Sequence, residues 1–289
     1  MTFDERVELH FAAMSPAEQR VIQFFRQNRE EVMIASAASM GRKTKTSDAT
    51  IVRAARRLGY SGLDALRRSL AEEMRQNLSP ADRLKRTLDE VGNNPTTAFQ
   101  ATIDTHLQCL QSLSRSILPG QFESVVDALA TARRVVAFGI GPSSAMVDYL
   151  ATQLGRFGIE ALSLTTTGLL FADDLRKLRD GDVVMIFAYG RVYAELAALL
   201  DSAKALDLRV FLVTDSLASA LKKRVEMILS VPRGRSDMLS MHTATLGFIE
   251  ALLVGIATKR PGETVASLKK LNQTRTRLAG KTVELHAAG

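Results

Sequence analysis

Cysteine and aromatic residues are scarce in this chain. Its 289 residues contain one cysteine, Cys109, and no tryptophan, and aromatic side chains make up 6% of the total. A single cysteine excludes an intramolecular disulfide framework, and without a CxxC pair it is typical of a reducing compartment. The sequence therefore argues against a small secreted scaffold held together by disulfides.

Targeting segments and long hydrophobic runs are missing as well. The first residues, MTFDERVELHF, are acidic and lack the apolar stretch of a signal peptide. The most apolar helical stretch, Leu246–Ala257, is too short to span a bilayer and contains Glu250. We expect a soluble cytoplasmic protein with no membrane partner.

Several motifs of catalysis and cofactor binding are absent. No group of His, Cys, Asp and Glu has metal-ligand spacing, and neither a GxSxG nor a Walker A motif occurs. The segment 139–144 is not a full GxGxxG motif because Ser144 stands at the third glycine position, and threonines instead of an acidic residue occupy 165–167. We predict no metal, no cofactor and no catalytic residue.

The chain does have a local excess of positive charge. Its net charge is +7, and its 46% hydrophobic content is enough to bury the cores of two domains. Between Arg42 and Arg68 there are eight basic and two acidic residues, so this window alone carries +6. Such a concentration favours a polyanionic partner, although solubility alone also explains a positive charge.

The same window has the pattern of a helix-turn-helix. Ser15–Glu18 predicts a helix start with a capping box. A second helix is predicted over Ile34–Lys43, followed by the polar turn Thr44–Thr46. Ser47 then caps a third helix, which ends at Gly59. The predicted inner face of this third helix consists of Ile51, Ala54, Ala55 and Leu58.

The second helix of a helix-turn-helix enters the major groove of DNA with its first residues near the bases. Ser47, Asp48 and Thr50 are predicted to lie there, with Arg53 one turn further on. The basic side chains around them are suited to phosphates. The predicted DNA-binding residues are Lys43, Lys45, Thr46, Ser47, Asp48, Thr50, Arg53, Arg56 and Arg57. On spacing alone, a small helical bundle with a solvated basic face explains the pattern equally well.

Turn-forming residues separate this region from the rest of the chain. Asn77–Pro80 and Gly92–Pro95 have linker composition, and helices are predicted over Ala81–Val91 and Ala98–Ile117. We therefore predict three regions. They are a helix-turn-helix domain at 1–77, a helical linker at 78–118 and a ligand-binding domain at 119–289.

Short apolar runs alternate with helical patterns from Arg133 onwards. Buried apolar strands joined by helical crossovers form a parallel sheet covered on both faces. The fold class predicted is therefore a two-domain α/β protein, with an all-α N-terminal domain followed by a doubly wound parallel five-stranded domain. The five predicted strands are Val135–Phe138, Ile159–Leu164, Val183–Ala188, Val210–Val213 and Met227–Val231.

Polar residues follow three of these strands, at the edge where parallel sheets bind ligands. Glycines allow a ligand close to the backbone, serines at a helix N-terminus favour an anion, and an arginine suits a phosphate or carboxylate. Residue type alone also permits Arg191 as a surface arginine and Asp215 as a helix cap. The predicted ligand-binding residues are Gly139, Gly141, Ser143, Ser144, Tyr189, Gly190, Arg191, Thr214, Asp215, Ser216 and Ser240.

A long helix is predicted over Asp237–Thr258, and it carries the candidates for a general base. His242 and Glu250 are two turns apart on it, so they would share one face. The structural alternative makes His242 a first-turn polar residue and Glu250 a paired or partly exposed one. A basic helix is also expected over Lys269–Lys281.

Residues Ser15–Glu73 resemble the N-terminal domain of RpiR-type bacterial transcription regulators. The likeness lies in the SP-x-E opening and in the pattern formed by Ser47, Thr50, Arg53 and Leu58–Tyr60. One departure is Gly41, where the family commonly has alanine. Glycine costs a helix about 1 kcal/mol relative to alanine, which predicts a less rigid second helix. The resemblance implies binding to a double-stranded DNA operator.

Residues Arg133–Ala257 resemble a SIS domain, the phosphosugar-binding fold of sugar isomerases. The third-strand loop of many SIS domains has the pattern Ser-x-Ser-Gly-x-Thr/Ser, whereas this chain has Phe187–Val192, in which only the glycine is kept. The resemblance implies a regulator that senses a phosphosugar and forms a homodimer or homotetramer. The altered loop leaves open three possibilities: a phosphosugar bound differently, another small anion held by Ser143, Ser144 and Arg191, or a site that has lost effector binding. The alternatives are a sugar-phosphate isomerase and a SIS module that regulates a protein partner.

Overall fold

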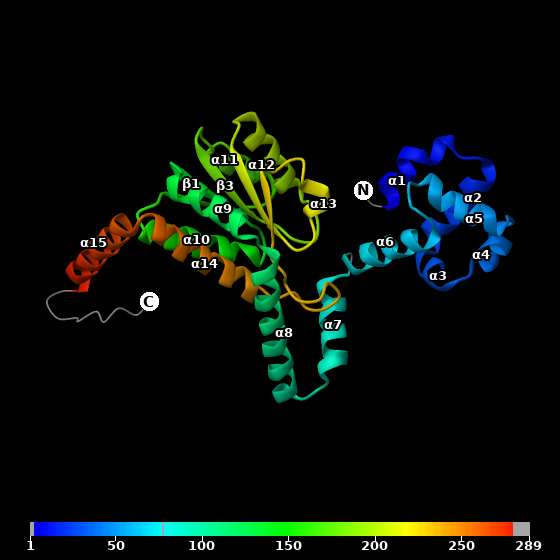
Figure 1. The fold of residues 1–289 in the computed structure, drawn as a ribbon, viewed down its shortest axis with the longest axis horizontal. Helices are drawn as coiled ribbons and strands as arrows, with labels where there is room; N and C mark the ends of the chain where they lie inside the picture. The colour runs from blue at the N-terminus through cyan, green and yellow to red at the C-terminus, as the bar shows by residue number, and fades with distance from the viewer. Residues whose placement is uncertain (1–2, 77, 280–289) are drawn as a thin grey trace. The chain divides into compact units, whose positions relative to one another are not determined.

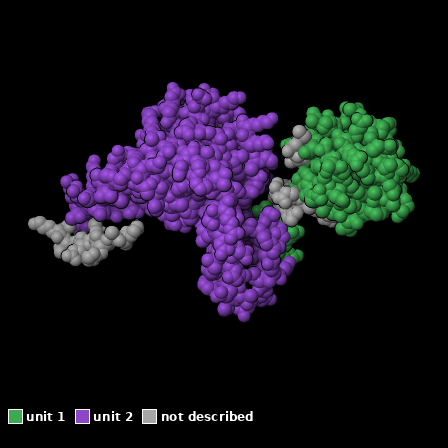
Figure 2. Space-filling model, viewed as in Figure 1, with its two compact units in different colours: residues 1–86 green, residues 87–289 purple. Residues whose placement is uncertain are grey.

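The computed structural model describes residues 3–76 and 78–279. Contacts along the backbone divide the chain into two units, residues 1–86 and 87–289, which Figure 2 shows in different colours. Each unit has its own hydrophobic core and is described by itself below.

The regular elements described in the first unit are all helices (Figure 1). They enclose a buried core, whose fully buried members include Phe3, Phe25, Ile51 and Leu66. Burying a side chain of this size stabilises a fold by about 1.5–3 kcal/mol. The elements are α1 (Phe3–His10), η1 (Phe11–Ala13), α2 (Pro16–Gln27), α3 (Arg29–Ile34), α4 (Ala37–Thr44), α5 (Asp48–Arg57), α6 (Leu63–Gln76) and the first part of α7 (Pro80–Val91).

The helix predicted over Ile34–Lys43 is wrong at its start. The structure has two helices there, because the chain is extended at Ala35 and Ser36 between α3 and α4. Ser36 caps α4 by accepting a hydrogen bond from the Ser39 amide at 3.1 Å. A serine cap is a local signal that the alanine-rich composition of the segment obscured.

The second unit contains a parallel sheet of five strands in the order β2-β1-β3-β4-β5. Val135 of β1 is in register with Ala161 on one side and Val183 on the other. This arrangement confirms the predicted fold class. The strands are β1 (Arg134–Phe138), β2 (Ala161–Leu164), β3 (Asp182–Phe187), β4 (Arg209–Thr214) and β5 (Met227–Ser230).

Helices cover both faces of this sheet (Figure 1). Val135 and Ala137 pack with α9, α10 and α14, whereas the alternate residues Val136 and Phe138 pack with α11, α12 and α13. This alternation follows from the two-residue repeat of a strand. The helices of the unit are α8 (Pro95–Ser116), α9 (Pro119–Thr131), α10 (Ser143–Arg156), η2 (Gly168–Leu170), α11 (Phe171–Leu175), α12 (Ala194–Ala205), α13 (Ala218–Leu221), α14 (Thr243–Lys259) and α15 (Pro261–Ala279).

The helix predicted from Asp237 begins six residues later, at Thr243. Residues 231–242 form a loop after β5, in which the amide of Met241 donates to the carbonyl oxygen of Arg233 at 3.1 Å. We call this segment the β5–α14 loop. The described part of the predicted basic helix over Lys269–Lys281 belongs to α15. None of the helices within 3–76 and 78–279 combines the length and the apolar character that crossing a bilayer requires.

Candidate functional site

Helices α4 and α5 are joined by a tight turn. Lys45 lies in the left-handed region, with φ of 53°, and the amide of Thr46 donates to the carbonyl oxygen of Gly41 at 2.8 Å. A Cβ atom on Gly41 would lie 2.9 Å from the Thr46 carbonyl oxygen. Glycine is therefore suited to this close approach. The contact gives a structural reason for a residue that is otherwise unfavourable in a helix.

Helix α5 is capped and packed as the sequence predicts. Ser47 Oγ accepts a hydrogen bond from the Thr50 amide at 3.3 Å, and Gly59, with φ of 81°, follows the end of the helix. Its inner face packs against α2 and α4. The fully buried residues of that face are Ile51, Ala54, Ala55 and Leu58.

The outer side of α5 and of the preceding turn is rich in exposed polar and basic side chains. This exposed set contains most of the residues predicted to bind DNA, and Thr46 is half-buried beside it. The geometry brings the set together on one side of one helix and its turn. The exposed members are Lys43, Lys45, Ser47, Asp48, Arg53, Arg56 and Arg57.

Thr50 is not on the exposed side of α5, because only 6% of the residue is exposed. Its hydroxyl lies 3.0 Å from Ser47 Oγ and accepts a hydrogen bond from Arg53 Nη2 at 3.1 Å. The structure therefore uses Thr50 to hold the cap and to orient Arg53. Sequence spacing placed it beside the bases because it could not show which side of the first turn is covered.

Two of the cations on this surface have acidic neighbours. Lys43 pairs with Glu31, and Arg57 Nε lies 3.8 Å from a carboxylate oxygen of Glu18. Hydrogen bonds from the amide and hydroxyl of Ser15 hold the pKa of Glu18 below its usual range, and Arg57 and Arg53 add to the effect. Within the described residues, Lys45 and Arg56 form no ion pair, so their charges are available to a polyanion.

The first candidate ligand segment, after β1, is tightly packed. A Cβ on Gly139 would lie 2.9 Å from Val147 Cγ2 and 3.0 Å from Ser143 Cβ. Gly141 has φ of 59°, and Ser144 Oγ donates to its carbonyl oxygen at 2.8 Å. Ser143 is buried in the first turn of α10. The close contacts at Gly139 and the positive φ of Gly141 explain both glycines structurally. Helix α10 begins at Ser143, directly after this segment, and a helix N-terminus favours an anion.

The second segment, after β3, carries a buried tyrosine. Tyr189 is 8% exposed, and its hydroxyl lies 2.9 Å from Thr245 Oγ1 of α14. Burial raises the pKa of Tyr189 far above its ordinary value, so it stays a neutral phenol. Gly190, with φ of 79°, donates its amide to Ser216 Oγ at 3.0 Å. Both groups are therefore committed to partners within the protein.

The third segment, after β4, forms a turn stabilised by Thr214. Its Oγ1 accepts hydrogen bonds from the amides of Ser216, at 3.2 Å, and Leu217, at 3.0 Å. Asp215 does not cap α13, which has no side-chain cap. The Asp215 carboxylate instead accepts hydrogen bonds from Ser216 Oγ at 2.7 Å and from Arg233 Nε at 3.0 Å.

Arg233, in the β5–α14 loop, is a residue that the sequence analysis missed. Its side chain is 12% exposed, and its guanidinium carbon lies 3.8 Å from the centre of the Tyr189 ring. The His242 ring meets the same tyrosine edge-on at 5.7 Å. We call Tyr189, Asp215, Arg233 and His242 the strand-edge cluster. An arginine two residues after a predicted strand was the available signal, since such a position lies at the same sheet edge as the other segments.

Arg191 and Ser240 are among the predicted ligand residues that lie outside this cluster. Arg191 is exposed, and its guanidinium carbon lies 5.1 Å from the centre of the Tyr193 ring. Ser240 is half-buried further along the β5–α14 loop. The structure therefore brings Tyr189 and Asp215 together through Arg233, while Arg191 contacts a different aromatic ring.

The two candidates for a general base do not form a pair. Glu250 is exposed and accepts a hydrogen bond from the Tyr149 hydroxyl at 3.3 Å. His242 precedes α14, and eight residues of helix separate the two by about 12 Å. Burial and the charge of Arg233 lower the pKa of His242. Among the described residues, no group of His, Cys, Asp and Glu is arranged to hold a metal ion.

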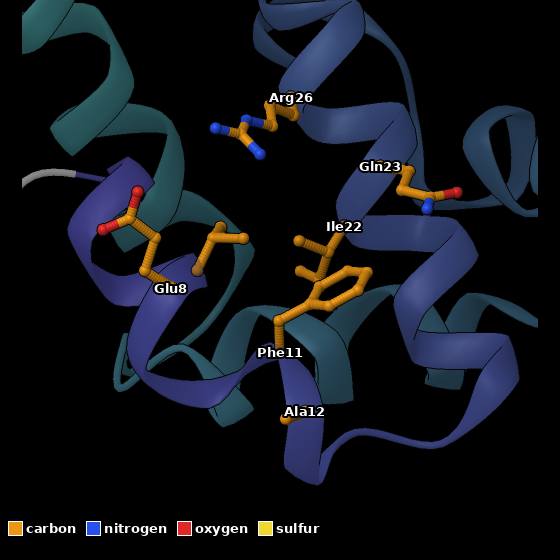
Figure 3. A pocket seen from close by; sticks show the side chains of 7 residues that line it. Glu8, Phe11, Ala12, Ile22, Gln23 and Arg26 are labelled. Carbon is orange, nitrogen blue, oxygen red and sulfur yellow. The ribbon is translucent and has the colours of Figure 1, made fainter.

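Each unit contains a pocket away from these residues. In the first unit, a pocket of about 420 Å³ lies between α1 and α2, and Figure 3 shows Phe11 and Ile22 in its apolar part, with Glu8 and Arg26 nearby. In the second unit, a pocket of about 280 Å³ lies between α7, α8 and the β5–α14 loop. Neither is lined by a residue predicted to bind DNA or ligand.

Comparison with protein families identifies a domain in each unit. Residues 1–77 match the helix-turn-helix domain of the rpiR family, and residues 128–255 match the SIS domain. The transcriptional regulator HexR of Escherichia coli is 22% identical over 94% of each chain. The bifunctional protein glk of Burkholderia mallei is 26% identical over 89% of this chain, which spans 40% of the length of that relative.

Solved structures share the fold. The Vibrio vulnificus NanR protein complexed with ManNAc-6P matches 96% of this chain and 99% of its own, with a TM-score of 0.56 and 22% identity. The sugar isomerase domain of an RpiR transcription factor from Sphaerobacter thermophilus matches 59% of this chain and 96% of its own, with a TM-score of 0.54 and 23% identity. At these identities the comparison shows the fold alone.

Proposed function

Because this chain belongs to the RpiR-type regulators, which join a helix-turn-helix domain to a SIS domain, we propose that it controls transcription in response to a small anionic metabolite. The observation that carries the proposal is the exposed basic side of α5, which is held by a capped turn. The predicted division places DNA binding in residues 1–77 and ligand binding in residues 119–289, with a helical linker at 78–118.

DNA binding rests on α5 and the turn before it. Exposed Ser47, Asp48 and Arg53 lie at the start of the helix, where a recognition helix meets base edges. Lys45 and Arg56 supply charge for phosphates. Helix-turn-helix proteins usually bind two half-sites as dimers, so we propose a homodimer or homotetramer on an operator in the cytoplasm.

A phosphosugar or a related anion is the effector that we propose. Its support is the SIS fold, together with the phosphosugar named with the NanR structure. In this chain the α10 N-terminus and the strand-edge cluster lie at the carboxyl edge of the sheet. The strand order reverses between β1 and β3, which is where open α/β sheets bind ligands.

We do not propose an isomerase. The Tyr189 hydroxyl is hydrogen-bonded to Thr245, and the Glu250 carboxylate to the Tyr149 hydroxyl. Glu250 lies about 12 Å from His242 along the helix. A general base must lie within hydrogen-bond reach of the proton that it removes. The two candidate bases, His242 and Glu250, are therefore too far apart to reach the same proton.

A gel-shift experiment with the upstream region of the protein's own operon tests the proposal. We expect a shift that survives an excess of unrelated DNA and that weakens as salt rises, because phosphate contacts release counterions. A matched DNA of shuffled sequence is the control. Equal binding to both DNAs would contradict a specific regulator.

A further inference from the structure

Arg233 is fixed in place from two sides. Its Nε donates to a carboxylate oxygen of Asp215 at 3.0 Å, and its guanidinium lies over the Tyr189 ring at 3.8 Å. Tyr189 is itself anchored, because its hydroxyl lies 2.9 Å from Thr245 Oγ1. An arginine held in this way keeps one orientation, whereas a free surface arginine samples many.

The contacts with Asp215 and Tyr189 leave the two Nη groups of Arg233 without hydrogen-bond partners among the described residues. Within the described residues, the Nη1 and Nη2 groups of Arg233 make no hydrogen bond, and Nε makes the only one. Each Nη group carries two N–H donors, and the pair forms the planar fork that matches a carboxylate or a phosphate. The protein thus presents an oriented pair of donors at the carboxyl edge of its sheet.

The usual donors of the neighbouring loop are unavailable. The loop after β3 has Tyr189 where a hydroxyl side chain is expected, and its hydroxyl points to Thr245. The Gly190 amide is bonded to Ser216 Oγ, and the Arg191 amide to the Tyr189 carbonyl oxygen. An anion at this edge therefore needs donors from another segment, and Arg233 lies directly against the substituted residue.

The surroundings of the fork are suited to a polar ligand. Asp215 neutralises the arginine, and its second oxygen is bonded to Ser216 Oγ, so the carboxylate is satisfied. His242 Nδ1, next to Tyr189, is buried and has no hydrogen-bond partner among the described residues. A buried polar atom without a partner is unusual in a folded protein and favours contact with a polar ligand group. The α10 N-terminus adds positive potential at the same edge.

We infer that Arg233, and not Arg191, binds the oxyanion group of the effector, in place of the hydroxyl loop of this fold. The inference rests on the proposed function and assigns the specificity for an anion to the β5–α14 loop. The shared chemistry is a phosphate monoester or a carboxylate, and the experiment below separates these two sources.

The test measures binding to the full chain in phosphate-free buffer by calorimetry and thermal shift. The probes are inorganic phosphate, hexose 6-phosphates, and a hexuronate as the carboxylate arm. If a probe binds the wild type, Arg233→Gln should weaken it about tenfold to a hundredfold, because a charged hydrogen-bond donor is lost. Arg191→Gln tests the rival assignment and should weaken binding less than Arg233→Gln does. Arg176→Gln, at an exposed site of the same unit, is the matched control and should keep wild-type affinity.

The outcomes separate the two proposals. Loss of binding in Arg191→Gln with retention in Arg233→Gln overturns the inference and leaves the proposed function intact. If no probe binds the wild type, the proposed effector and the inference both fail. Arg233→Lys keeps a cation but lacks the fork, so it remains informative if the glutamine variant does not fold. Its affinity should fall below that of the wild type, and unchanged affinity would contradict a bidentate contact.

Discussion

Lys45 adopts a backbone conformation that L-amino acids rarely adopt, with φ of 53°. Lys45→Gly should relieve this strain and stabilise the first unit by about 1 kcal/mol. The same change removes a phosphate-binding charge, so DNA affinity should fall and its salt dependence should weaken by about one ion. Urea unfolding and salt titrations of a gel shift measure the two effects.

Lys45→Ala is the matched control for that experiment. It removes the charge and keeps a Cβ, so stability should stay near the wild type while DNA binding weakens as in the glycine variant. If Lys45→Gly leaves DNA affinity and salt dependence unchanged, then Lys45 does not contact phosphate.

Arg53 is oriented by Thr50 near the start of α5. If it contacts a base, Arg53→Ala should weaken binding to the operator by about 1–3 kcal/mol and relax the preference at one position. Arg176→Ala, on an exposed site of the second unit, is the control and should have no effect. An equal loss of affinity for operator and shuffled DNA would assign Arg53 to the phosphates instead.

Helix α2 begins with a complete capping box formed by Ser15 and Glu18. Ser15→Ala should destabilise the first unit by about 1 kcal/mol, because an amide loses its acceptor and Glu18 loses its partner. Ser61→Ala, at an exposed serine whose side chain makes no hydrogen bond among the described residues, should change little. Thermal unfolding of both variants measures the difference.

The charge of Glu18 adds a pH dependence to that helix start. Its pKa is held below its usual range in the folded state. The stabilisation is therefore complete above the unfolded value of about 4.3 and is lost as the pH falls through the lower folded value. The stability difference between the wild type and Glu18→Gln should be largest near neutral pH and should shrink below about pH 4. A constant difference down to pH 2 would contradict this assignment.

Strands β1 and β3 are joined at their starts by a buried ion pair. Asp182 is 2% exposed and accepts hydrogen bonds from Arg134 Nε at 3.0 Å and Nη2 at 2.7 Å. Asp182→Asn should cost about 3 kcal/mol or more, since it leaves the partly buried arginine without its counter-charge. Glu160 lies 3.7 Å from the same arginine but is 65% exposed, so Glu160→Gln should cost under about 1 kcal/mol. Urea unfolding that ranked them the other way would contradict the prediction.

The β5–α14 loop connects the strand-edge cluster with α7. It contributes Arg233 to the cluster, while the amide of Leu239 donates to Thr87 Oγ1 at 2.9 Å and Arg235 pairs with Glu90 at 2.7 Å. Helix α7 continues directly into the chain of the first unit. If the effector shifts this loop, the Thr87 contact carries part of the coupling free energy between ligand and DNA.

Thr87→Val removes the hydroxyl at nearly constant volume and should reduce the factor by which a bound hexose 6-phosphate changes DNA affinity. The affinity for each ligand alone should stay close to the wild type. The measurement is operator affinity with and without the metabolite in both proteins. The same ratio in the wild type and the variant would show that the contact does not transmit the signal.

Much of this protein follows from sequence alone, because the signals are local. The Ser47 cap, the Gly59 end and the inner face of α5 follow from helix periodicity and capping. The buried runs around Val135 and Val183 predict a parallel sheet because both faces of such strands are covered. These features depend on neighbours a few positions away, which a single sequence contains.

Tertiary structure alone decided the details of the candidate sites. Arg233 meets Tyr189 and Asp215 only because three strand ends converge at one sheet edge. The Tyr189 hydroxyl points to Thr245, 56 residues along the chain, and so leaves the loop without its expected hydroxyl. The burial of Thr50 depends on how α5 packs. Such contacts join segments far apart in sequence, and their geometry is set by packing, which residue spacing does not contain.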